Sequence, residues 1–301
     1  MAQSICAGYA FNSGVSPCPL DPGKIKGLIL YTDDNAVGVD LSSPMSTEAG
    51  LTSRFYAARP NRLFPIGGIV NYESSGGEVQ TSQVGYGASR ITGYSEKQMT
   101  FTIDHYDFNL RAAIANARGT KFKVLFVDDN NVVYGLAADS GTYDLGLKGV
   151  QVDDIAVGGQ DFATADTTAN LAVTLYINDY EEVLKSLSAV KLDYDVADAL
   201  QGLVFVDVAF RSGSPNDIVL VAIKEHYSGH NISAAVSGMV NTQNVLSVFT
   251  NNGSSTAVNS VTYDSDADAI SIKSGLTTSD FTGLADANTL YNNGVFGIEG
   301  W

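Results

Sequence analysis

The stretch QMTFTIDHYDFNLRAAIANARGTKFKVLFVDDNNVVYGLAA, residues 98–138, decides the fold. Its first six residues alternate between apolar and polar side chains, as a half-buried strand does. Asp107 is a favourable N-cap, and the apolar residues after it form one helical stripe that stops at Gly119. Two apolar runs then flank the turn at 128–131, which indicates a β-hairpin. The order of strand, helix and hairpin predicts an antiparallel sheet or barrel with one packed helix.

Further strands are expected on both sides of this stretch. Residues 25–32, IKGLILYT, form an apolar run that ends at a turn-forming Asp-Asp-Asn triplet. The runs at 149–157 and 170–178 also have strand character. Between 33 and 83 the periodicity fades, apart from a possible helical turn at 48–56. This composition, rich in Gly, Ser, Thr and Asn and poor in charge, favours short strands joined by turns.

The chain changes character after a short helix or linker at 179–192. Beyond residue 200 we expect only short strands, at 203–210, 217–224, 231–237, 244–250, 259–263 and 269–273. Strands at this spacing suggest a sandwich of immunoglobulin-like type. The prediction is a mainly β protein with an irregular N-terminal arm at 1–24, a β-sandwich or barrel over 25–190 with a flanking helix at 107–118, and an immunoglobulin-like β-sandwich over 191–301.

The longest connection, residues 71–97, contains two Gly-Tyr pairs. Long connections in compact domains are functional or disordered. Aromatic anchors flanked by glycine, in a loop that orders on meeting a partner, are one interpretation, and an exposed disordered loop is the other. The candidate self-assembly residues are Gly76, Gly77, Tyr86, Arg90 and Tyr94.

Charge is distributed unevenly along the sequence. Residues 1–125 hold 11 Lys/Arg and 10 Asp/Glu, whereas residues 126–301 hold 6 and 23, for a net charge of −16. An acidic surface repels phosphate, so nucleic-acid binding through the C-terminal half is disfavoured. The candidate electrostatic contacts are Arg54, Arg59 and Arg62. They bind an anion, contact the acidic half of a neighbouring copy, or are simply solvated charges.

The N-terminal region gives little chemical information. Cys6 and Cys18 form a local disulfide, contribute to a metal site with further ligands, or remain reduced. The opening residues lack the basic and apolar segments of a secretory signal, so we expect a cytoplasmic origin. No run approaches the roughly 20 apolar residues that cross a bilayer, and no membrane span is expected.

The sequence departs from the catalytic and cofactor motifs that it partly resembles. Gly85 and Gly87 are followed by Arg90 where a dinucleotide fingerprint needs its third glycine. The acidic run that begins at Asp264 lacks the glycine and glutamate of a calcium loop, and His226 and His230 lack a third metal ligand. Adjacent carboxylates at 33–34, 128–129 and 153–154 are typical of turns rather than of a glycosidase. We predict no enzyme, no catalytic residue, no cofactor and no metal.

The order of elements from about residue 25 to 178 resembles the tail tube proteins of tailed bacteriophages. In that resemblance the loop is NYESSGGEVQTSQVGYGASRITGYSEK and the flanking helix is DFNLRAAIANARG. It implies a virion protein, made in the bacterial cytoplasm, whose copies form hexameric rings that stack into a tube. The long loop would reach the neighbouring subunit, other tail proteins would be partners, and DNA would pass through without specific binding. An added immunoglobulin-like domain also occurs among phage tail proteins.

Two other interpretations stay open at this stage. A broad loop region before Gly85 fits a different virion protein, such as a capsid or collar component. A cell-surface or virion adhesin would use Tyr and Trp side chains to stack on carbohydrate. The sequence has one tryptophan, Trp301.

Overall fold

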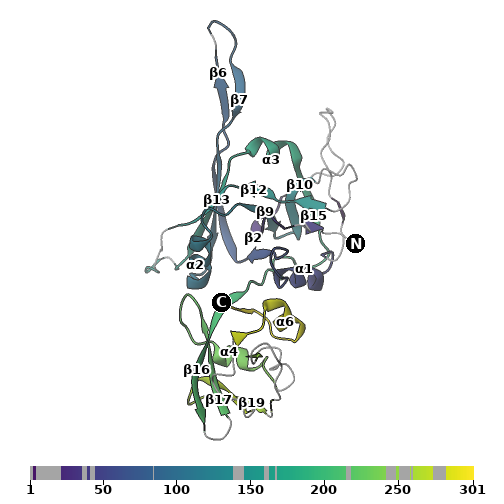
Figure 1. Ribbon diagram of the computed structural model, residues 1–301. Helices are drawn as coiled ribbons and strands as arrows, with labels where there is room; N and C mark the ends of the chain where they lie inside the picture. The colour runs from purple at the N-terminus through teal and green to yellow at the C-terminus, as the bar shows by residue number, and fades with distance from the viewer. Residues whose placement is uncertain are drawn as a thin grey trace. The chain divides into compact units, whose positions relative to one another are not determined.

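The chain divides into two units, which are described separately (Figure 1). The computed structural model describes residues 3–4, 22–35, 39–40, 45–83, 85–137, 146–158, 163–166, 168–214, 218–241, 249–250, 258, 260–273 and 283–301. Unit 1 comprises residues 1–55 and 59–201, and unit 2 comprises residues 56–58 and 202–301. Cys6 and Cys18 lie outside the described residues.

Unit 1 is built on two antiparallel sheets. The larger sheet runs in the order β1 (Gln3–Ser4), β15 (Leu187–Lys191), β10 (Val132–Ala137), β9 (Phe122–Asp128), β2 (Ile25–Thr32) and β4 (Phe64–Ile66), and β3 (Val39–Asp40), β11 (Gly146–Lys148) and β12 (Val150–Val152) join it at the side. The smaller sheet runs in the order β13 (Asp154–Val157), β14 (Leu171–Ile177), β8 (Lys97–Ile103) and β5 (Ile69–Gly76). A separate ribbon pairs β6 (Val79–Ser82) with β7 (Arg90–Tyr94). The helices are α1 (Glu48–Phe55), α2 (Phe108–Asn116) and α3 (Tyr180–Ser186).

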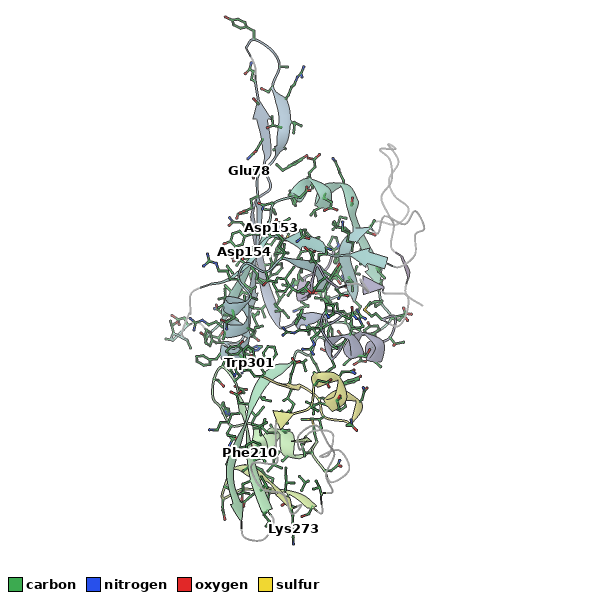
Figure 2. The ribbon with its side chains drawn as sticks, in the orientation of Figure 1. Glu78, Asp153, Asp154, Phe210, Lys273 and Trp301 are labelled. Carbon is green, nitrogen blue, oxygen red and sulfur yellow. The ribbon has the colours of Figure 1, made fainter. Side chains whose placement is uncertain are left out.

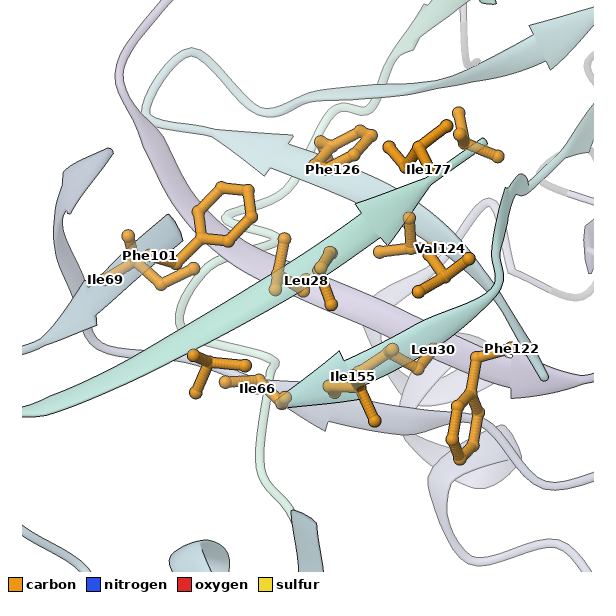
Figure 3. Packing of buried hydrophobic residues seen from close by; sticks show 14 of the residues in the cluster. Leu28, Leu30, Ile66, Ile69, Phe101, Phe122, Val124, Phe126, Ile155 and Ile177 are labelled. Atoms are coloured by element: carbon orange, nitrogen blue, oxygen red, sulfur yellow. The ribbon is translucent and has the colours of Figure 1, made fainter. Parts of the chain in front are cut away.

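The hydrophobic core of unit 1 joins the two sheets (Figure 3). Leu28 and Leu30 of β2 belong to one buried cluster with Phe101 of β8. The residues between them in β2, such as Ile29, are buried as well, so this strand is covered on both faces. Coverage on both faces explains why the strand is a continuous apolar run rather than an alternating one.

A buried carboxylate holds the β9–β10 turn to the segment before β2. Asp128 is 0% exposed, and its Oδ2 accepts hydrogen bonds from the Gly23 amide at 2.9 Å and from the Tyr134 hydroxyl. Its Oδ1 accepts from the amides of Asn130 and Val132, both at 2.9 Å. A buried carboxylate is tolerated when donors surround it in this way. The adjacent carboxylates at 128–129 therefore stabilise the turn by accepting backbone hydrogen bonds.

Unit 2 holds a five-stranded sheet and short helices. The sheet order is β19 (Ser260–Asp264), β20 (Ala269–Lys273), β17 (Ile218–Glu225), β16 (Val204–Ser214) and β22 (Ile298–Gly300), and β22 runs parallel to β16. The remaining elements are the pair β18 (Phe249–Thr250) with β21 (Gly283–Leu284), and the helices α4 (Ser233–Ser237) and α6 (Ala287–Asn292).

Three residues from early in the chain also belong to unit 2, namely residues 56–58. The Tyr56 ring stacks on Tyr291 with 4.6 Å between centroids, and it meets Phe296 edge-on. Tyr56 is 2% exposed. Burial raises the pKa of its phenol, and a hydrogen bond with the Gly297 backbone partly offsets that effect.

The mainly β class is confirmed, and so is the helix that begins after Asp107. The Asp107 carboxylate accepts from the amides of Asn109 and Leu110, and Gly119 has φ +81° just after the helix. Unit 1 also contains α1 and α3 in addition to this helix. No described helix is both long and apolar enough to cross a bilayer.

Three expectations about local structure are wrong. Residues 71–97 are not a loop, because they contain the end of β5, the β6–β7 ribbon and the first residue of β8. The run 149–157 is two strands in different sheets, because the chain crosses between the sheets at Asp153. Residues 231–237 contain helix α4 instead of a strand, with the Asn231 side-chain oxygen accepting from the Ser233 amide and hydroxyl. The short helix expected within 179–192 is confirmed as α3, and β15, which follows it, extends the larger sheet of unit 1.

We expect Asp128→Ala to lower the free energy of unfolding by about 3 kcal/mol or more, because it leaves buried donors without a partner. Asp129→Ala is the matched control, since the Asp129 Oδ1 accepts one exposed bond, from the Lys24 amide. Urea unfolding followed by circular dichroism measures both. Equal losses for the two variants would contradict this role for Asp128.

Alkaline pH offers a second test of the same network. Burial and the hydrogen bond to the Asp128 carboxylate raise the pKa of Tyr134 above its ordinary value. The resulting stabilisation is fully present below the unfolded-state pKa of about 10 and is lost as the pH rises towards the higher folded-state pKa. Tyr134→Phe should therefore show a shallower decline in unfolding free energy between about pH 9 and pH 11 than the wild type. Parallel declines would refute this linkage.

Candidate self-assembly arm

A β-ribbon projects from the smaller sheet of unit 1, and we call residues 77–96 the arm (Figure 1). It prolongs the β5–β8 pair, whose register runs from Ile69 opposite Ile103 to Gly76 opposite Lys97. The ladder then continues without a break, because the Gly77 amide donates to Glu96 O at 3.2 Å and the Ser95 amide donates to Glu78 O at 2.9 Å. The arm therefore extends a strand pair that begins in the core.

Two glycines at the foot of the arm have left-handed backbone conformations, with φ +71° at Gly76 and +75° at Gly77. A Cβ on Gly76 would lie 2.0 Å from the carbonyl oxygen of Glu96. A Cβ on Gly77 would lie 2.8 Å from the Tyr180 ring. These positions thus require glycine both for backbone angle and for space.

Tyr180 of α3 anchors the foot of the arm. Its ring meets Tyr94 edge-on, with 6.4 Å between centroids, and the Lys97 ammonium lies 5.5 Å from the ring centroid. The Lys97 ammonium also donates to Ser74 Oγ at 3.1 Å. Aromatic and cation–π contacts of this kind contribute about 0.5–1.5 kcal/mol each. The foot of the arm is therefore held against helix α3.

Beyond the foot the arm has no core of its own. Every described residue of β6 is exposed, as are the first three residues of β7. Val79 and Ile91 are 51% and 66% exposed although both are apolar. A two-stranded ribbon with both faces in water is only marginally stable by itself. The exposed side chains of the arm therefore add no apolar packing to unit 1.

The tip of the arm presents an aromatic side chain. Tyr86 is fully exposed, and Gly85 beside it has φ +60° with open space around its Cα. The Gln83 side-chain amide donates to Gly87 O at 2.8 Å across the tip. Arg90 is exposed and has no ion-pair partner among the described residues. The tip is closed by its own hydrogen bond while its ring and its cation face solvent.

The candidate self-assembly residues predicted from the sequence lie in two parts of the β5–β8 ribbon, the foot and the distal half. Gly76, Gly77 and Tyr94 lie at the foot, and Tyr86 and Arg90 lie in the distal half. Sequence reasoning missed Tyr180, Val79 and Ile91. Val79 and Ile91 could have been found as isolated apolar residues within a polar segment. No pattern in the sequence around Tyr180 indicates its contact with Gly77.

The three arginines outside the arm have different surroundings. Arg62 is only 4% exposed, which removes it from surface contacts. Burial lowers the pKa of the Arg54 guanidinium, whose Nε and Nη2 are buried without a hydrogen-bond partner. Arg59 is exposed and lies 5.9 Å from the Phe64 ring centroid. Of the three, Arg59 is thus the one placed to meet a partner in solution.

The other acidic candidates have structural roles. The Asp33 carboxylate pairs with Lys123 at 3.0 Å, and the Asp264 carboxylate caps a turn by accepting from the Asp266 and Ala267 amides. His226 bonds Asp207 at 2.9 Å, and its ring stacks on Trp301. Within the described ranges, no three His, Cys, Asp or Glu side chains gather as metal ligands.

We expect Gly77→Ala to loosen the foot of the arm, because it adds a contact with Tyr180 to the strain of a positive φ. Gly85→Ala is the matched control, since its φ is also positive but open space surrounds it. Hydrogen exchange across residues 69–103 should rise clearly more in Gly77→Ala than in Gly85→Ala. Equal exchange in the two variants would show that Tyr180 does not hold the arm.

Comparisons with known proteins place the chain in no family. No protein-family model matches it, and no curated protein matches it. A solved structure with detectable similarity is the anti-feeding prophage cap, described as the tube-terminating cap. The alignment covers 60% of this chain and 98% of that one, with 9% sequence identity and a TM-score of 0.28. A TM-score of that size does not establish a shared fold or function.

Proposed function

We propose that this protein is a non-enzymatic structural subunit of a virion that assembles with copies of itself. The observation that carries the proposal is the arm, a ribbon with a well-anchored foot and an exposed apolar and aromatic distal half. Exposed apolar positions on a projecting element favour an interaction surface.

Sheet edges support association with identical copies. β5 and β13 are the outermost described strands of the smaller sheet, and neither has a second strand partner among the described residues. Open edges invite uncontrolled pairing, and closure into a ring removes them. We propose rings that stack as the tail tube of a phage, with other tail proteins as further partners.

The charge is compatible with a tube that carries DNA. Unit 1 contains 14 Lys/Arg and 24 Asp/Glu, and unit 2 contains 3 and 9, so both units are acidic. The uneven charge along the sequence thus does not separate the units. A like-charged wall lets DNA pass with little adhesion. We propose that DNA transits without specific binding.

Removal of the arm tests the proposal. Residues 79–94 are replaced by Asn-Gly, a tight hairpin turn, since Glu78 and Ser95 already pair through the Ser95 amide. The wild type should form rings or tubes in negative-stain images and large species by light scattering. The shortened variant should stay monomeric, with an unfolding midpoint lowered only by the loss of the Tyr94 contact with Tyr180, because the rest of the arm adds no buried core.

Two outcomes would contradict the proposal: a wild type that remains monomeric at high concentration, or a shortened variant that assembles as well as the wild type. Rings that never stack would favour a collar component over a tube.

A further inference from the structure

A polar hollow lies where α2 meets the edge strand β13. It has a volume of about 440 Å³ and includes Ala115 and Arg118 of the α2 region, Asp153, Asp154 and Val157. Glu96, at the foot of the arm, lines it too. Figure 2 shows Asp153 and Asp154 close to the foot of the arm, below Glu78.

The hollow is acidic, and part of its charge is not used internally. Glu96, Asp153 and Asp154 face a single cation, Arg118. Asp153 Oδ2 accepts from the Asn178 amide, and Asp154 Oδ1 accepts from the Gly119 and Ile155 amides. The second oxygen of each aspartate has no hydrogen-bond partner among the described residues. The hollow can therefore receive a cation.

The distal half of the arm has complementary chemistry. Between residues 79 and 94 the one charged side chain is Arg90. It lies on the same projecting hairpin as the exposed Tyr86 ring. A guanidinium suits a paired carboxylate, and a tyrosine ring suits a hollow with both apolar and polar walls.

The hollow cannot be filled by the arm of the same molecule. Nine residues separate Gly77 from Tyr86, and at about 3.3 Å per residue the tip lies roughly 30 Å from the foot. The hollow begins at Glu96, at the foot itself. Only the arm of a second copy can bring its tip there.

We propose that the tip of the arm of one copy docks into the α2–β13 hollow of a second copy, with Tyr86 in the hollow and Arg90 against Asp153 and Asp154. The inference rests on the proposed self-assembly and names its receptor surface. Because tip and hollow are different surfaces, the contact is head-to-tail and generates a ring or an open filament.

Cysteine cross-linking tests the contact in the full-length chain. Tyr86→Cys and Ala115→Cys are combined in a Cys6→Ser, Cys18→Ser background, and a mild oxidant is added. The expected result is a ladder of dimers, trimers and larger species on a non-reducing gel. Tyr86→Cys combined with Leu184→Cys, an exposed position on α3, is the control and should give no ladder beyond dimers.

A charge exchange provides an independent readout. Arg90→Glu and Asp153→Arg should each raise the protein concentration needed for half-maximal assembly by about tenfold, and the double variant should recover most of the loss. Lys273→Glu, which reverses an exposed cation of β20 outside the arm, should leave that concentration unchanged.

The outcomes separate the two proposals. Wild-type assembly with neither a ladder nor recovery in the double variant would overturn the docking site and leave self-assembly intact. A wild type that does not assemble would overturn both.

Discussion

The pairing of β5 with β8 is the constraint on which the arm depends. One end of this ladder lies in the core, where Ile69 and Ile103 are buried opposite each other. The other end leaves the sandwich at Gly76 and Lys97 and continues as a ribbon. Since β8 also pairs along its length with β14, the direction of the arm is set by a central strand. The core therefore fixes the direction of the arm, although the exposed half of the arm does not pack in the core.

This construction separates two physical tasks. Burial between the sheets stabilises unit 1, so the core does not constrain which side chains the arm carries. The foot needs special chemistry, because two positive-φ glycines and the Tyr180 ring must coexist in little space. The distal positions are exposed, and substitutions there should have little effect on folding.

The sequence predicted the parts of unit 1 where a run of buried apolar residues or a capping side chain leaves a local pattern. The strand at 25–32 and the helix after Asp107 match their expected positions because such signals are local. The arm was expected as a loop because a ribbon wet on both faces has no alternation to detect. The Tyr180 contact with Gly77 spans about 100 residues and leaves no trace in either segment. The immunoglobulin-like type of unit 2 stays a prediction, since its strands alternate with helices α4 and α6.

Unit 2 has a consequence for synthesis of the chain. Its Tyr56 leaves the ribosome about 235 residues before Tyr291, the ring on which it stacks. At about 5–20 residues per second this interval lasts roughly 10–50 s. During that time the Tyr56 ring lacks the partner on which it stacks in the folded protein, because residues 59–201 of unit 1 and most of unit 2 are synthesised first. Translation speed and chaperone access therefore bear on the yield of correctly folded chains.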